Sequence, residues 1–157
     1  MAQRSALMAR IKGTHTKPER MVFAWLRKCG IHFQRHYRRA PGSPDVARPK
    51  DKKALFIEGD FWHGWGYRAR KDRLPEFWRN KIERNMRRDR KNHRALKRKG
   101  WELLRIWEHD LKGSFDGTLL RVVGFLDPHA LPRAKDLLIK ARKAERNPAK
   151  RDKKAKT

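Results

Sequence analysis

The chain has 157 residues, of which 43 are Lys or Arg and 17 are Asp or Glu, giving a formal net charge of +26. A charge this large favours a polyanionic partner through counterion release, so nucleic acid is the leading candidate and an anionic membrane surface its competitor. The single cysteine, Cys29, excludes an internal disulfide framework and any site with two thiolate ligands. No stretch approaches the roughly 20 apolar residues of a membrane span. With no secretory signal expected either, we predict a cytoplasmic, nucleoid-associated protein.

Apolar periodicity predicts an α/β protein with a small mixed β-sheet flanked by helices. Thr16 and Glu19 fit a capping box at the start of the first helix, and Gly30 fits its end. In chain order, the expected elements are a helix over residues 17–29, a short strand over 31–37, strands over 45–47 and 54–57, a long basic helix over 76–99, a strand over 101–107, and helices over 119–126 and 131–143. Residues 50–52 fit the tip of a hairpin.

Two acids stand at the ends of neighbouring predicted strands. Asp45 follows the turn PGSP and opens a strand, and Glu58 ends the next strand. Two carboxylates placed in this way can share a hard cation such as Mg²⁺, which prefers oxygen ligands, and the carbonyl of Ile57 can add a neutral ligand. The alternative is that Asp45 serves only the turn and that Glu58 forms a salt bridge.

Asp89 lies on the face of the long helix that should be buried, three residues after Met86 and seven after Ile82. A buried carboxylate needs a partner, which is either one of the many arginines or a catalytic histidine. His63, in the aromatic segment after Glu58, is the candidate histidine, because an imidazole exchanges protons near neutral pH. The alternative for His63 is packing against a neighbouring tryptophan.

Four further residues have both a structural and a functional interpretation. Glu19 fits helix capping, and its spacing also points it inward, which leaves a catalytic role as the alternative. Phe61 and Trp62 lie between Gly59 and Gly64, where their rings either fold into the core or wedge between base pairs. Met8, in the basic N-terminal segment, is either an ordinary apolar residue or a second candidate wedge.

The order of these motifs resembles that of the very-short-patch-repair (Vsr-type) DNA mismatch endonucleases of the PD-(D/E)xK superfamily. The matching pieces run from about Arg4 to Leu111 and include PGSPD ending at Asp45, FIEGDFWH ending at His63, the long helix with Asp89, and the strand that begins after Gly100. The resemblance implies a restriction-endonuclease-like core. We expect a basic DNA-contacting arm over residues 1–15, the endonuclease domain over 16–130, and a basic helical to disordered tail over 131–157.

The resemblance also implies a role for each candidate residue. Asp45 would be the central metal ligand, with the Ile57 carbonyl as a further ligand. His63 would be the general acid/base and Asp89 would orient it. Glu19 would support the water molecules around the metal.

The implied reaction is a nick in one strand of duplex DNA beside a T·G mismatch, which leaves a 5′-phosphate for repair. Phe61 and Trp62 would enter the duplex from one side, with Met8 opposite them. A monomer is expected, and repair proteins are possible partners.

The sequence departs from this family in two ways. The best-known members hold a structural zinc near the FWH segment, whereas this chain offers only Asp60 and His109 there, so we expect these two residues to pair and no structural zinc to bind. Glu58 stands where such members have histidine, and Asp60 stands where the PD-(D/E)xK motif has lysine. We therefore expect Mg²⁺ or Mn²⁺ as the cofactor, with Glu58 as a direct or water-mediated ligand.

Other functions remain open from the sequence alone. The same fold could serve a nuclease of a mobile element or defence system with another DNA target. A non-catalytic DNA-binding protein or a ribosomal-type RNA binder would also explain the charge and the aromatic residues, but neither would explain the set of acids around His63.

Overall fold

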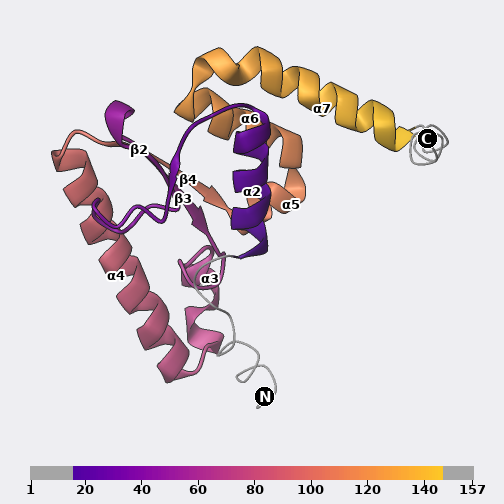
Figure 1. The fold of residues 1–157 in the computed structure, drawn as a ribbon. Coiled ribbons are helices and arrows are strands. Elements are labelled where there is room, and N and C mark those ends of the chain that lie inside the picture. Colours follow the sequence, from indigo (N-terminus) through magenta and orange to yellow (C-terminus); the bar gives the residue numbers. More distant parts are fainter. Residues whose placement is uncertain (1–15, 147–157) are drawn as a thin grey trace.

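In the computed structural model, which describes residues 16–146, four strands form one mixed sheet in the order β1–β2–β3–β4 (Figure 1). The strands are β1 (Gln34–Arg35), β2 (Val46–Arg48), β3 (Lys53–Glu58) and β4 (Glu102–Trp107). The pairs β1–β2 and β2–β3 are antiparallel, whereas β3 and β4 are parallel. The C-terminal ends of β3 and β4 therefore meet at one edge of the sheet, where Glu58 pairs with Trp107.

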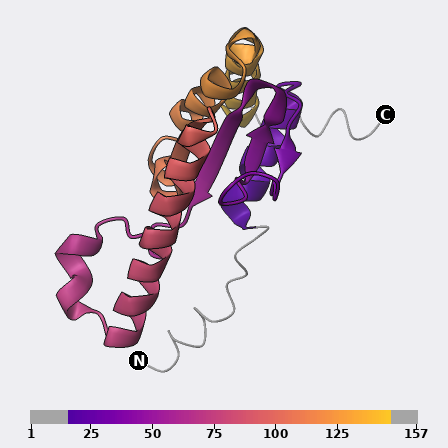
Figure 2. The ribbon, with the colours of Figure 1, turned by 90° about the vertical axis from the view of Figure 1, so that its left-hand side faces the viewer.

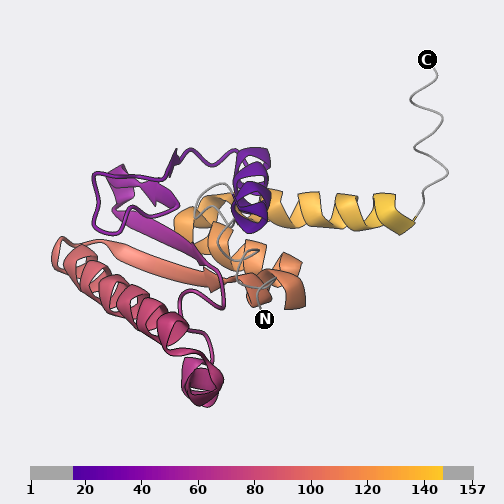
Figure 3. The same ribbon diagram turned by 90° about the horizontal axis from the view of Figure 1, so that it is seen from below.

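Helices cover both faces of this sheet. One face carries α2 (Lys17–Lys28), α6 (Phe115–Leu126) and α7 (Leu131–Arg146), and the opposite face carries α4 (Glu76–Arg98) (Figure 3). The short helix α3 (Tyr67–Arg70) lies beside the N-terminal half of α4 (Figure 2), where the Tyr67 hydroxyl donates to Glu83 Oε1 at 2.7 Å. The remaining helices are α5 (Glu108–Gly113) and the 3-10 turns η1 (Pro49–Asp51), η2 (Lys71–Arg73) and η3 (Pro128–Ala130).

Alternation along the strands divides the apolar side chains between two clusters. Leu55 and Ile106 belong to the larger cluster, which lies between the sheet and α2, α6 and α7. Ala54 and Phe56 belong to the smaller cluster under α4, together with Leu96. Because successive strand residues point to opposite faces, the side chains of Glu58, Arg105 and Trp107 lie on the α4 face.

The loop between β1 and β2 is held against α4 by a close backbone approach. Gly42 has φ 80°, and a Cβ atom there would lie 3.0 Å from Cβ of Asn92. Any side chain at this position would be strained and would push against the helix. The loop closes at its base with a hydrogen bond from His36 N to Asp45 O at 3.1 Å, which places these two residues side by side.

The expected α/β architecture is confirmed, and the differences are local. The first strand is shorter than predicted, because Ile31 packs into the larger core and His36, with φ 47°, leaves the extended conformation. Helix α5 was not predicted. Helix α7 packs Ala134 and Leu138 into the larger core, so the segment from residue 131 begins as part of the same unit.

The second half of α7 extends away from the body, and residues 139–146 are exposed (Figure 1). The arm over residues 1–15, including Met8, and the end of the tail lie outside the described residues. None of the helices within residues 16–146 has the length and hydropathy that a bilayer crossing requires.

Candidate active site

Asp45 is a largely buried carboxylate at the start of β2. Its Oδ2 accepts a hydrogen bond from Ile57 N at 2.7 Å, which ties the aspartate to the neighbouring strand β3. Burial, together with the charges of Glu19 and Glu58, raises the pKa of Asp45 to about 7 against the opposing hydrogen bond from Ile57 N. The nearby charge of His63 lowers the pKa of Asp45, but it does not offset the effect of burial.

Glu19 and His36 surround Asp45 from the side of α2. Glu19 is 2% exposed, and its Oε1 accepts from Thr16 Oγ1 at 2.9 Å, so the capping box is present. Its other oxygen, Oε2, lies 3.4 Å from Nε2 of His36, and Nδ1 of His36 lies 3.8 Å from Oδ1 of Asp45. One imidazole thus stands between two acids. The capping interpretation of Glu19 and its predicted place beside Asp45 are compatible.

His63 and Asp89 form a close pair next to this group. Nδ1 of His63 lies 2.7 Å from Oδ2 of Asp89, and ligand atoms of His63, Asp89 and Glu58 all lie within 4.8 Å of one another. Burial alone would lower the pKa of His63, but the hydrogen bond to Asp89 and the charges of Glu58 and Asp89 outweigh it and raise the pKa. Burial would raise the pKa of Asp89, but its bond to His63 lowers it overall.

Glu58 is held by an arginine that sequence reasoning did not single out. Arg105 donates from Nε to Oε2 of Glu58 at 2.9 Å and also from Nη2 to the same oxygen. Burial raises the pKa of Glu58, and the bond to Arg105 opposes that effect. The salt bridge considered as the alternative for Glu58 is therefore present.

The four acids fall into two neighbouring groups. Glu19, His36 and Asp45 bring ligand atoms within 4.8 Å of one another, and Glu58, His63 and Asp89 do the same. Asp45 and Glu58 belong to different groups, although the charge of Glu58 acts on Asp45. Their sharing of one cation therefore stays a prediction.

This donor set fits a hard divalent cation. Carboxylate oxygens are the ligands that Mg²⁺ and Mn²⁺ prefer. The raised pKa of Asp45 results first from burial and then from the neighbouring acids, so a bound cation would stabilise its charged form. An imidazole at His36 is compatible with Mn²⁺ as well.

The aromatic residues of the site form a group of their own, which we call the aromatic group: Phe61, Trp62, Phe77 and Trp78. Phe61 and Trp62 contact each other at 5.0 Å between ring centroids, and Trp62 contacts Trp78 at 5.5 Å. Nζ of Lys81 lies 4.8 Å from the ring of Trp62, and Phe77 is 67% exposed. None of the four belongs to either core cluster within the described residues. The rings thus gather outside the core.

Asp60 and His109, at the positions that the family resemblance associates with zinc ligands, contact each other. Nδ1 of His109 lies 2.7 Å from Oδ1 of Asp60, as predicted, and its ring lies 4.2 Å from that of Trp65. Trp65 also contacts Trp107 at 5.2 Å. A hydrogen bond and aromatic packing therefore join α5 to the loop after β3.

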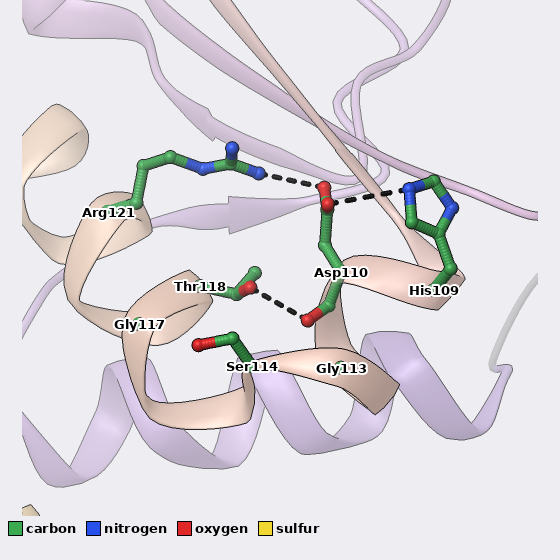
Figure 4. A pocket seen from close by; sticks show the side chains of 7 residues that line it. All are labelled: His109, Asp110, Gly113, Ser114, Gly117, Thr118 and Arg121. Atoms are coloured by element: carbon green, nitrogen blue, oxygen red, sulfur yellow. Dashed lines mark hydrogen bonds and ion pairs between the residues drawn. The ribbon is translucent and has the colours of Figure 1, made fainter.

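A separate hollow of about 430 Å³ lies on α5 and α6 (Figure 4). At its wall, Asp110 pairs with Arg121 at 2.8 Å, and Nε2 of His109 lies 3.5 Å from the same carboxylate. Thr118 donates from its hydroxyl to the carbonyl of Asp110 at 3.0 Å. These polar groups are paired with one another, and the hollow contains none of the acids predicted to act on DNA.

Comparison with known proteins decides the family. The model of the family described as DNA mismatch endonuclease Vsr matches residues 1–69. The type II nicking enzyme V.XorIIP of Xanthomonas oryzae pv. oryzae is 35% identical over 131 residues, which cover 80% of this chain and 93% of that protein. The chain belongs to the Vsr endonuclease family.

Two other relatives match over a somewhat shorter part of the chain. The type II nicking enzyme V.NmeDIP of Neisseria meningitidis serogroup C is 38% identical over 112 residues, covering 69% of this chain and 76% of that protein. The DNA mismatch endonuclease Vsr of Escherichia coli (strain K12) is 32% identical over 116 residues, covering 71% and 73%. The resemblance that the sequence motifs suggested is confirmed, and the mixed sheet with flanking helices agrees with a PD-(D/E)xK core.

Proposed function

We propose that this chain is a divalent-cation-dependent DNA endonuclease that nicks one strand of a duplex beside a T·G mismatch, as the first step of very short patch repair. Family membership supports the nuclease class. The names of its relatives, nicking enzyme and mismatch endonuclease, support nicking and mismatch recognition. The observation that carries the proposal is the His63–Asp89 pair beside the buried Asp45.

The His63–Asp89 contact defines the direction of proton transfer. A carboxylate accepts hydrogen bonds, so the hydrogen of a neutral His63 lies on Nδ1 and the lone pair is on Nε2. Nε2 accepts a proton from the attacking water as its oxygen forms a bond to phosphorus. The bond from phosphorus to the 3′ oxygen breaks, and that oxygen takes a proton from solvent. The products are a 3′-hydroxyl and a 5′-phosphate.

Asp45 is the residue proposed to hold the cation, Mg²⁺ or Mn²⁺, with the carbonyl of Ile57 as a second ligand. Glu58 would act directly or through water, and Glu19 would hold a water molecule nearby. When bound, such a cation supplies positive charge to the phosphate and lowers the pKa of an attacking water. Glu58 has one oxygen occupied by Arg105, which favours its action through water.

Duplex DNA is the proposed substrate, recognised by the aromatic group and by the basic surface. Phe61 and Trp62 lie directly before His63 in the chain, so stacking of these rings on unpaired or weakly paired bases would bring the backbone of that strand to the site. A mismatch lowers the energy needed to open the base stack, which gives the rings a preference for it. The protein is proposed to act as a monomer.

A nicking assay tests this function. End-labelled duplexes with a T·G mismatch, matched T·A duplexes and single strands are incubated with Mg²⁺ or EDTA, and Asp45→Ala serves as the blank. We expect Mg²⁺-dependent nicking of the T·G duplex that Asp45→Ala abolishes. Cutting without mismatch preference would keep the nuclease but contradict the repair role, and binding without cutting would contradict both.

A further inference from the structure

Arg105 is a charged residue in an otherwise apolar run of β4, and the proposed reaction gives it no role. The strand reads ELLRIW, and its arginine points to the α4 face two residues before the end of the strand. There it reaches the edge of the sheet at which Glu58 and His63 lie. A guanidinium in this position needs a partner, and Glu58 provides it.

The position of this arginine is fixed on two sides. Nε and Nη2 both donate to Oε2 of Glu58, and the guanidinium carbon lies 4.8 Å from the ring centroid of Trp107. The aromatic face and the carboxylate together hold the plane of the guanidinium. Nη1 carries further N–H donors that the bond to Glu58 does not use.

The two partners differ sharply in their exposure. The side chain of Glu58 is 3% exposed, whereas that of Arg105 is 34% exposed. Solvent, or a ligand from solvent, therefore meets the positive charge of Arg105 before the negative charge of Glu58. A pair that served only to neutralise Glu58 would not require the guanidinium to be open to solvent.

The charge of the surrounding site makes this exposed cation significant. Glu19, Asp45, Glu58 and Asp89 are gathered at this end of the sheet, and without added cations they would repel a phosphate. The charge of Arg105 reaches the neighbouring histidines: burial lowers the pKa of His93, and Arg105 lowers it further. Asp60, at the position of the missing lysine, is turned towards His109 and carries the wrong charge.

We propose that Arg105 is a catalytic residue whose guanidinium binds a non-bridging oxygen of the scissile phosphate and supplies the positive charge that the PD-(D/E)xK lysine would otherwise provide. This inference rests on the proposed nuclease function. Arg105 stays protonated throughout and exchanges no bond with the substrate. Its contribution is to attract the phosphate and to stabilise the negative charge that grows on the oxygens as water attacks.

A thermodynamic cycle isolates this contact. The nick is first mapped with wild-type protein, and T·G duplexes are then made with an ordinary phosphate or an uncharged methylphosphonate at that position. Dissociation constants are measured by fluorescence anisotropy in EDTA for wild type and Arg105→Met. We expect Arg105→Met to weaken binding of the ordinary duplex by about tenfold or more beyond its effect on the methylphosphonate duplex, because a charge-assisted hydrogen bond is lost.

Two further variants keep the result interpretable. Arg48→Met removes another half-buried guanidinium, which bonds Asp127 at 3.1 Å at the opposite end of β2, and should affect both duplexes equally. Arg105→Lys leaves a cation beside Glu58 in case Arg105→Met does not fold. A single ammonium cannot keep both bonds to Glu58 and reach the phosphate. We therefore expect Arg105→Lys also to reduce the difference in affinity between the ordinary and the methylphosphonate duplex.

The outcomes separate this inference from the proposed function. One outcome is that wild type nicks the duplex but Arg105→Met or Arg105→Lys weakens binding of the ordinary and methylphosphonate duplexes equally. That outcome would show that Arg105 only neutralises Glu58. The absence of nicking on every substrate would contradict the proposed function and remove this inference with it.

Discussion

Oδ2 of Asp89 lies 2.7 Å from Nδ1 of His63, and this contact joins the middle of α4 to the loop that follows β3. The helix is anchored beneath the sheet by Ile82 and Leu96, both fully buried. Asp89 is therefore a rigidly placed acceptor, and it determines which nitrogen of His63 is available as a base. The catalytic proposal depends on this relationship more than on any other.

Asp89→Asn should slow nicking and shift its pH dependence. Activity requires a neutral His63, so it is lost as the pH falls through the raised pKa of that residue. Without the charge and hydrogen bond of Asp89, burial dominates and lowers the pKa, so the acidic limb of the pH–rate profile moves to lower pH. The rate at the plateau should fall roughly 10²- to 10⁴-fold, because the imidazole loses its orientation.

The matched control for this prediction is Glu83→Gln, on the same helix. Glu83 accepts a hydrogen bond from Tyr67 and lies outside both groups of acids. Single-turnover rates measured across the pH range should leave its profile unchanged. A profile of Asp89→Asn with the wild-type midpoint would contradict the role of Asp89 as the partner that raises the pKa of His63.

Asp45→Asn should stabilise the metal-free protein at neutral pH while abolishing nicking. The pKa of Asp45 is raised from 3.8 to about 7, so its contribution to stability is complete below the unfolded pKa and is lost as the pH rises through about 7. Asparagine is neutral at every pH, so it avoids the cost of burying an ionised carboxylate. The rise in pKa from 3.8 to about 7 corresponds to roughly 4 kcal/mol, so we expect up to that gain in the free energy of unfolding at about pH 8, and little gain near pH 4.

Urea unfolding in EDTA at these two pH values measures the effect. Asp51→Asn, in η1 at the other end of the sheet, is the control, because Asp51 pairs with Arg48 on the surface. Added Mg²⁺ should raise the stability of wild type and not that of Asp45→Asn. An Asp45→Asn variant less stable than wild type at pH 8 in EDTA would count against a strained, cation-seeking carboxylate.

Trp62→Ala should weaken binding to T·G duplexes with little loss of stability. Stacking of a base on an aromatic ring contributes about 1–3 kcal/mol, which corresponds to roughly fivefold to hundredfold in affinity. The ring lies outside both core clusters among the described residues, so the melting temperature should change little. Trp65→Ala is the control from the same loop, since Trp65 packs on His109 and Trp107 instead. If Trp62→Ala binds T·G and T·A duplexes with the same affinities as wild type does, a wedge role for this ring is excluded.

Much of the fold could be predicted, because its elements carry local signals. The capping box at Thr16 and Glu19, the apolar run of β3 and the stripe of α4 are each readable from neighbouring residues. The Asp60–His109 pair was also predictable, because both residues stand at positions that the family resemblance associates with zinc ligands.

The residues that were missed depend on contacts distant in sequence. His36 meets Asp45 only because β1 pairs antiparallel with β2, and no motif indicates that pairing. Arg105 meets Glu58 through the parallel register of β3 and β4. A signal for Arg105 was nevertheless present, since a lone charge inside an apolar strand requires a buried partner of opposite sign.

His109→Ala should lower stability because the pairing with Asp60 joins α5 to the loop after β3. A lost side-chain hydrogen bond costs about 1 kcal/mol, and Trp65 would also lose a ring neighbour. His32→Ala, at an exposed position, should leave the melting temperature unchanged. Elemental analysis of the purified wild-type protein should find no stoichiometric zinc, and tightly held zinc would contradict the replacement of the metal by this pair.

The most direct test of the central claim is the single-turnover rate of nicking on T·G and T·A duplexes that are otherwise identical, with Mg²⁺ present and with EDTA. We predict that wild type cuts one strand of the T·G duplex much faster than the T·A duplex. The new end should carry a 5′-phosphate that ligase accepts, and EDTA or Asp45→Ala should stop the reaction. Equal rates on both duplexes, or cutting that persists in EDTA and in Asp45→Ala, would contradict the account.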